Sequence, residues 1–467
     1  MARPPDKTLR PGGAKNHGFW LIFHRPAVYD VRPNYRTQNP NKETAMSRAF
    51  NFNAGPAVLP LEVLEIAQKE LIDFNGTGMS IMEHSHRGKA YDAVHAEAVA
   101  NMAKLLGAND DYQILFLQGG ASLQFAQVPM NLLGTGQSAD YVNSGAWASK
   151  AIKEAKKIGS VNIVADTSKE IPTNMPDYSA LNYTKGAAYV HVTSNETIAG
   201  TQIQQFPKTE APLVCDMSSD ILCRPFDLKQ FGLIYAGAQK NLGPSGVTLV
   251  VIRKDLIERA PATLPTMLQY RTQAKENSLY NTPPTFGIYI LMLVTRWLLA
   301  KGGAAGIEKI NRAKADKIYA AIDGSGGYYR GGANKAFRSI MNITWRLPSE
   351  ALEEKFIKEA TALKMIGLKG HRDVGGCRAS IYNACPAEAV DALVAFMKDF
   401  QAKNGYTPIP PGMHARRGKP RRAFLSMDGK APPDGKIRKG GQPDGNWCAW
   451  RGSNPQPLAP EANALSN

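Results

Sequence analysis

The sequence predicts an α/β protein with a large, mainly parallel α/β/α domain and a smaller α+β domain. Short apolar runs alternate with helical patterns over most of the 467 residues, which is typical of βα units around a parallel sheet. The strand-like runs end in polar or glycine-rich turns, where an open α/β sheet binds its ligand. From about Gly302 the alternation gives way to another pattern, which indicates a second domain.

Each expected strand of the large domain is a short apolar run bounded by turn residues. We expect strands at Tyr112–Leu117, Ala139–Asn143, Val161–Val164, Ala187–Val192, Pro212–Asp216, Leu233–Ala236 and Val247–Ile252. The expected helices include Leu61–Asp73, Lys89–Leu106, Trp147–Ile158 and Thr285–Ala300. The longest apolar stretch, Phe286 to Ala300, contains Arg296 and is too short to span a bilayer of about 30 Å, so we expect a buried helix and no membrane partner.

After Gly302 we expect two helical stretches followed by strands and helices of a smaller α+β domain. These later elements are a strand at Met341–Leu347, a helix at Ala351–Leu363, a strand at Arg378–Tyr382 and a helix at Pro386–Ala402. The expected domains are therefore residues 61–301 and 302–406, with residues 48–60 as an N-terminal segment that joins the small domain.

The net charge of +16 is concentrated at the two ends of the chain. Residues 1–47 contain 8 Lys and Arg against 3 Asp and Glu, residues 408–467 contain 10 against 4, and the rest contains 38 against 33. Both ends are rich in Pro and Arg with little periodicity, so we expect residues 1–47 and 407–467 to be disordered extensions. The modest charge of the rest suits small anions better than a nucleic-acid backbone, and HARRGKPRR (414–422) lacks interleaved aromatic residues. We therefore expect no nucleic-acid partner.

The five cysteines do not form a metal or disulfide pattern, because their number is odd and no CxxC pair is present. We expect no metal site, a buried free thiol at Cys215, and a reducing, cytoplasmic compartment.

Lys240 is the most informative residue, since it follows a strand and lies among small residues in YAGAQKNLGPSG. A lysine that forms a Schiff base must reach a carbonyl without bulky neighbours, and burial must lower its proton affinity. A lysine in a glycine-rich loop can equally be solvated or bind phosphate, so this motif alone leaves the choice open.

Asp216 ends another strand, 24 residues before Lys240. Pyridoxal phosphate needs a carboxylate beside its ring nitrogen, and an Asp and a Lys at the ends of neighbouring strands would hold opposite sides of the ring. A strand-end Asp can also simply stabilise a turn.

Three further features suit the same cofactor. The turn QGGASLQ follows a strand, and the backbone N–H groups of Ala121 and Ser122 would face an anion at the start of a helix. Trp147 is a candidate to stack on a ring, although core packing would explain it equally well. Thr197 follows a strand, where its hydroxyl would reach the cofactor or stabilise a turn.

These elements, in this order, resemble phosphoserine aminotransferases, which are fold-type I enzymes of the class V aminotransferase group. The resemblance covers about residues 48–405 and includes the motifs FNFNAGPAVLP, MEHSHRGK, GGASLQF, SNETIAG, YAGAQKNLGPSG, NTPPTF and LKGHRDVGGCRASIYNA. It implies pyridoxal 5'-phosphate as the cofactor and a homodimer with shared active sites.

The resemblance assigns a role to each motif. It makes Lys240 the Schiff-base lysine and Asp216 the partner of the ring nitrogen. The cofactor-binding residues that it implies are Ala121, Ser122, Trp147, Thr197, Asp216, Gln239 and Lys240, with Asn281 and Thr282 from the second subunit. Many relatives have Gly-Arg where this chain has Ala121 and Ser122, so the contact of that arginine side chain is absent here.

Substrate binding would depend on positive charge, because L-glutamate and O-phosphoserine both have an amino-acid head and a distal anion. The resemblance assigns the α-carboxylate to Arg378, and the distal group to His86, Arg87, His371 and Arg372, the first two reaching across a dimer interface. The implied reaction transfers the amino group of L-glutamate to 3-phosphohydroxypyruvate in serine biosynthesis, with a possible further role in pyridoxal phosphate biosynthesis.

The nearest alternative is another class V enzyme. A cysteine desulfurase needs a reactive cysteine on a mobile loop, whereas the cysteines here lie in or beside strand-like segments. An alanine–glyoxylate aminotransferase has no need of the basic motifs HSHRG and KGHR, so comparing phosphorylated with unphosphorylated keto acids would distinguish the two.

Overall fold

The computed structural model describes residues 48–170 and 173–405, and these residues belong to one compact unit. The extensions expected at residues 1–47 and 407–467 lie outside the described residues, as does Cys448.

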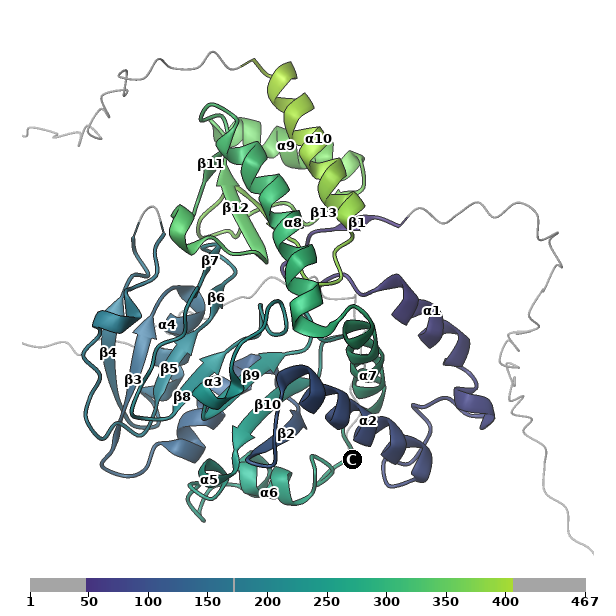
Figure 1. Ribbon diagram of the computed structural model, residues 1–467, viewed down its shortest axis with the longest axis vertical. Coiled ribbons are helices and arrows are strands. Elements are labelled where there is room, and N and C mark those ends of the chain that lie inside the picture. The colour runs from purple at the N-terminus through teal and green to yellow at the C-terminus, as the bar shows by residue number, and fades with distance from the viewer. Residues whose placement is uncertain (1–47, 171–172, 406–467) are drawn as a thin grey trace, which may run out of the picture. The chain divides into compact units, whose positions relative to one another are not determined.

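A seven-stranded sheet lies at the centre of the first part of the chain, with the strand order β2-β10-β9-β8-β5-β3-β4 (Figure 1). Its strands are β2 (Tyr112–Leu117), β3 (Ser138–Asn143), β4 (Ser160–Asp166), β5 (Val190–Thr193), β8 (Leu213–Asp216), β9 (Leu233–Gly237) and β10 (Thr248–Arg253). Both antiparallel pairings in this sheet involve β10 and the other four pairings are parallel, so the predicted α/β fold with a mainly parallel sheet is confirmed.

Helices cover both faces of this sheet because successive side chains of each strand point to opposite faces. In β2, Ile114 and Phe116 pack with α2 and α7, whereas Leu115 and Leu117 pack with α3 and α4. The helices of this part are α1 (Leu61–Glu70), α2 (Lys89–Leu106), α3 (Gly120–Leu132), α4 (Ala146–Ala155), α5 (Lys254–Ile257), α6 (Tyr270–Lys275) and α7 (Thr285–Ala300). The expected boundaries differ from these by at most three residues.

The second part of the chain has its own sheet and hydrophobic core, which includes Trp345, Phe356 and Phe400. Its elements are α8 (Gly303–Asp323), β11 (Arg330–Gly331), β12 (Asn342–Arg346), α9 (Glu350–Ala362), β13 (Met365–Ile366), β14 (Cys377–Ser380) and α10 (Ala387–Lys403). Near the N-terminus of the described chain, β1 (Phe50–Asn51) pairs in parallel with β13.

The prediction of two helical stretches after Gly302 is wrong. One helix, α8, spans 21 residues without a break, because its buried side chains recur at helical spacing over its whole length. Between α8 and β12 the helical structure of the described chain is limited to a three-residue 3-10 turn, Lys335–Phe337. Among the described residues no single helix is long and apolar enough to cross a bilayer, although α7 and α8, bent by 80° at their junction, together have the length and composition.

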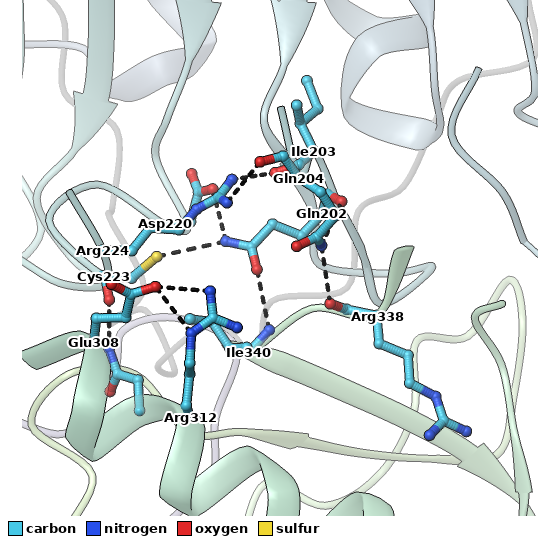
Figure 2. A network of polar contacts seen from close by, with 11 residues as sticks. Gln202, Ile203, Gln204, Asp220, Cys223, Arg224, Glu308, Arg312, Arg338 and Ile340 are labelled. Carbon is cyan, nitrogen blue, oxygen red and sulfur yellow. Dashed lines mark hydrogen bonds and ion pairs between the residues drawn. The ribbon is translucent and has the colours of Figure 1, made fainter. Parts of the chain in front are cut away.

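A polar network joins the two sheets where β7 (Thr201–Gln202) meets the start of β12 (Figure 2). The side chain of Gln202 accepts a hydrogen bond from the backbone N–H of Ile340 at 3.1 Å and donates one to the buried Asp220 at 3.0 Å. Gln204 donates to the carbonyl oxygen of Arg338 at 3.4 Å. These bonds fix the start of β12 relative to the residues that follow β8, and β12 in turn pairs with β14, the strand that contains Arg378.

Candidate active site

Lys240 lies in a cavity of about 240 Å³ beyond the carboxyl ends of β8 and β9. These strands are parallel neighbours, so their ends meet at one edge of the sheet. The cavity is lined by Ala54, Gly55, Gly120, Ala121, Ser122, Trp147, Thr193, Asn195, Thr197, Ile198, Asp216, Ser218, Ser219, Gln239, Lys240, His371 and Arg378.

The amine of Lys240 has less affinity for protons than an ordinary lysine. Burial lowers its pKa, and the negative charges of Asp216 and Glu196 oppose this effect in part. Gly55 packs directly on the lysine side chain, since a Cβ added there would lie 3.4 Å from the lysine Cγ, and its φ of +138° also favours glycine. The motif AGP near the start of the described chain therefore forms one wall beside the lysine.

Asp216 is 5% exposed at the end of β8. Burial raises the pKa of its carboxyl group, whereas hydrogen bonding by Ser218 and the charge of Lys240 lower it. The backbone N–H of Ser218 donates to its Oδ1 at 2.9 Å, which fixes the carboxylate in the cavity wall.

Trp147 forms another wall. The Nζ of Lys240 lies 5.5 Å from the centroid of its ring, and the indole N–H donates to the hydroxyl oxygen of Thr197 at 2.8 Å. The tryptophan and threonine singled out from the sequence therefore contact each other at the edge of the cavity.

The first turn of α3 lies at one end of the cavity. The first N–H groups of a helix have no partner within it, and here they belong to residues that include Ala121 and Ser122. Gly119 precedes the helix with φ +88°, and a Cβ there would lie 2.5 Å from Leu123, so the turn needs glycine. Gln239 also lines this cavity.

Two basic residues of the second sheet and its loops line the same cavity. Arg378 donates to the carbonyl oxygen of Thr197 at 3.1 Å, and its buried Nε has no hydrogen-bond partner among the described residues. Burial lowers the pKa of Arg378. Burial also lowers the pKa of His371, against the effect of Asp373, whose Oδ2 lies 3.3 Å from the histidine Nδ1. The neighbouring Arg372 is exposed and is not part of the cavity wall.

The four residues expected to reach a second subunit do not line this cavity. Arg87 is exposed and donates to the carbonyl oxygen of Leu279 at 3.4 Å, two residues before Asn281. Thr282 is exposed as well, and the buried Nε2 of His86 has no partner among the described residues. The HSHRG motif therefore contacts the residue that lies two positions before NTPPTF.

Sequence reasoning missed Asn195 in the cavity wall and the buried Glu196 next to it. Asn195 lines the cavity and connects it to the second sheet, because its side chain donates to the Oδ1 of Asn342 at 2.8 Å. Glu196, fully buried, accepts hydrogen bonds from the start of α4, and burial raises its pKa to about 7. Both lie beside Thr197 in SNETIAG, so the motif contained the signal, although nothing in it shows which of its side chains point inward.

The cavity fits pyridoxal phosphate in three respects. An amine with lowered proton affinity, a buried carboxylate and free helix N–H groups line one space, and these groups match the aldehyde, the ring nitrogen and the phosphate of the cofactor. The unpartnered Nε of Arg378 leaves a guanidinium available for a carboxylate of the substrate.

This fold and site define an aminotransferase of class V. The model of the class V aminotransferase family matches residues 49–393, so the chain belongs to this family.

Within that family the chain belongs with the phosphoserine aminotransferases. The enzyme of that name from Geobacillus kaustophilus is 58% identical over 358 residues, which cover 77% of this chain and 99% of that protein. The solved phosphoserine aminotransferase from Bacillus circulans subsp. alkalophilus is 57% identical with a TM-score of 0.76, covering 77% of this chain and 99% of that one. A pyridoxal-phosphate-bound phosphoserine aminotransferase from Trichomonas vaginalis is 42% identical with a TM-score of 0.73. The match covers 75% of this chain and 100% of that one.

The alternative of an alanine–glyoxylate enzyme has a much weaker basis. Such an enzyme from Nostoc sp. is 16% identical with a TM-score of 0.61 over 79% of this chain and 99% of that one, a likeness that concerns the fold alone.

Proposed function

We propose that this protein transfers the amino group of L-glutamate to 3-phosphohydroxypyruvate, giving O-phospho-L-serine and 2-oxoglutarate for serine biosynthesis. The observation that carries the proposal is the placement of Lys240, Asp216 and Arg378 around one cavity. The four described cysteines are free and buried, which suits a reducing, cytoplasmic compartment.

Pyridoxal phosphate would be held by its phosphate at Ala121, Ser122 and Gln239 and by its ring between Trp147 and Asp216. When bound, it supplies an aldehyde that condenses with the substrate amine and a protonated ring that accepts negative charge from the substrate α-carbon. Asp216 keeps that ring nitrogen protonated, because a buried carboxylate strongly favours a nearby positive charge.

Lys240 is the proton carrier in this proposal. Its lowered pKa leaves a larger fraction of the amine unprotonated near neutral pH, and an unprotonated amine can take the proton from the substrate α-carbon. The same amine then returns the proton as a general acid. The walls formed by Gly55 and Trp147 limit the space around the amine and so keep it directed into the cavity.

Substrate selection would depend on two anion-binding regions. Arg378 would bind the α-carboxylate within the cavity. For the distal phosphate or carboxylate, Arg372 would provide positive charge, and the imidazole of His371, whose pKa burial lowers, would donate a hydrogen bond. Arg372→Ala should weaken the binding of the phosphorylated substrate more than that of glutamate, because a dianionic phosphate loses more electrostatic attraction than a carboxylate when one positive charge is removed.

The second subunit would supply His86, Arg87, Asn281 and Thr282. In support of a dimer, the segment just before His86 in the sequence carries several exposed apolar side chains. They are Leu71, Ile72, Met79 and Met82, and Ile72 is 81% exposed. Exposed apolar side chains concentrated in one segment are a feature of protein–protein contact surfaces.

Two measurements test the proposal. Purified protein should show the absorbance of bound pyridoxal phosphate and should lose it on borohydride reduction. Steady-state kinetics should then show that 3-phosphohydroxypyruvate is preferred over glyoxylate by a large ratio of kcat/KM. Equal use of the two keto acids would exclude a site selective for phosphorylated substrates.

A further inference from the structure

Glu196 has a contact pattern that the proposed reaction does not explain. Its side chain is 0% exposed and lies in β6 (Asn195–Glu196), yet it contacts the start of α4. Its two carboxylate oxygens accept hydrogen bonds from the backbone N–H groups of Trp147 and Ala148, each at 3.1 Å. Ser144 donates to the same carboxylate at 3.4 Å.

The start of α4 is shaped to receive this carboxylate. The residue before the helix is Gly145, and a Cβ there would lie 2.5 Å from the Cδ of Glu196 and 2.7 Å from its Oε2. The φ of Gly145 is +169°, which is extended backbone that any residue adopts, so backbone strain does not explain the glycine. The glycine is needed because the carboxylate occupies the space of a side chain.

These contacts hold Trp147 at two points. Glu196 binds its backbone N–H, and the next residue along the chain, Thr197, accepts its indole N–H at 2.8 Å. Two successive residues, Glu196 and Thr197, therefore hold both the backbone and the ring of Trp147, which lies 49 and 50 residues earlier in the chain. That ring lies 5.5 Å from the Nζ of Lys240.

We infer that Glu196 is a positioning residue, which acts through Trp147 to hold the indole ring against the cofactor-binding cavity. The inference rests on the proposed function, because it assigns Glu196 an effect on pyridoxal phosphate binding. A carboxylate at the start of a helix also stabilises the helix itself. The two roles are separable, because helix stabilisation alone requires no energetic coupling between Glu196 and the ring of Trp147.

The first test measures the affinity of the cofactor-free protein for pyridoxal phosphate, with binding monitored by absorbance. The titration is done at pH 8, which is above the Glu196 pKa of about 7, so that the carboxylate is mostly ionised. Glu196→Gln keeps the size of the side chain, but its NH₂ group faces one of the two backbone donors. We expect affinity about tenfold weaker, the equivalent of about 1.4 kcal/mol. Asp227→Asn is the matched control, because Asp227 accepts the N–H of Lys229 at 3.0 Å at the start of a 3-10 turn away from the cavity. Its affinity should equal that of the wild type.

The second test is a double-mutant cycle with Trp147→Ala. If Glu196 acts through the ring, Glu196→Gln should weaken affinity by less than about twofold once the ring is absent. Equal losses in both backgrounds, or no loss in the single variant, would overturn the inference. Gly145→Ala disturbs the same contact, because the added Cβ would displace the Glu196 carboxylate. Its loss of affinity should likewise depend on the Trp147 ring, so this variant tests the inference even if Glu196→Gln does not fold.

The outcomes separate this inference from the proposed function. Failure of the wild type to bind pyridoxal phosphate would reject the proposed function itself. Normal binding by the wild type together with additive losses in the cycle would reject the role of Glu196 alone.

Discussion

At the scale of single residues, the chemistry of Lys240 depends on its surroundings more than on its position in sequence. Burial lowers its pKa while two carboxylates limit that change. We predict that Lys240→Ala lowers kcat by about 10³-fold or more, because no other lysine among the described residues lines the cavity to move the proton. The borohydride-sensitive absorbance should also be lost. Lys157→Ala is the control, since Lys157 is exposed and pairs with Glu154 at 2.7 Å on the surface, and near-normal turnover in Lys240→Ala would refute the assignment.

Asp216 permits a more conservative substitution at the same scale. Asp216→Asn keeps the shape of the side chain but removes the charge that stabilises a protonated ring, so we predict a loss in kcat of about 10²-fold. Asp177→Asn is a matched control, because Asp177 also accepts the N–H of the residue two positions on, Ser179, at 3.0 Å, and lies on the surface. A rate equal to the wild type in Asp216→Asn would mean that the ring nitrogen has another partner.

At the scale of elements, helix α8 holds the loop after β14 through one buried lysine. The amine of Lys314 donates to the carbonyl oxygens of Ile381, Tyr382 and Cys385 at 3.1, 2.8 and 3.1 Å. The same loop reaches the active site, because the backbone N–H of Asn383 donates to Asn241, next to Lys240, at 3.0 Å. Packing of α8 thus contributes to the position of the loop that contains Lys240.

Lys314 also predicts a dependence of stability on pH. Burial lowers its pKa to about 8, whereas an unfolded lysine titrates near 10.4. Between these values the unfolded chain binds a proton that the folded chain does not, so the free energy of unfolding should rise with pH by on the order of 3 kcal/mol. Denaturant unfolding should show about 2 kcal/mol of this rise between pH 8 and pH 10 in wild-type protein relative to Lys314→Met. The control Lys317→Met removes an exposed lysine of the same helix, and an identical pH response in both variants would contradict the prediction.

At the scale of the whole molecule, the active site should require two chains. Arg87 lies on the surface beside Leu279 and does not line the cavity of its own Lys240. We predict that Arg87→Ala and Lys240→Ala chains are each nearly inactive alone but regain activity when mixed. Each heterodimer contains one site with an intact lysine from one chain and an intact arginine from the other. Full subunit exchange without recovered activity would show that Arg87 serves the lysine of its own chain.

The sequence by itself determined the main features of the large sheet and the chemical class of the site. Strands such as Tyr112–Leu117 are short apolar runs between turn residues, and helix Lys89–Leu106 has apolar positions at helical spacing, so local patterns suffice to predict them. Lys240 and Asp216 were predictable for a related reason, because parallel strands end at one edge and bring their following residues together.

Only the tertiary structure decided which other side chains share that space. Glu196 reaches the start of a helix about 50 residues earlier, Gly55 packs on Lys240 from the far end of the chain, and Lys314 is buried although lysines usually lie on the surface. In each case the partner is distant in sequence, and the contact depends on how whole elements pack. Local patterns of hydrophobicity and turn residues do not reveal such long-range contacts. These contacts nevertheless determine which charged groups are buried and where there is no room for a Cβ.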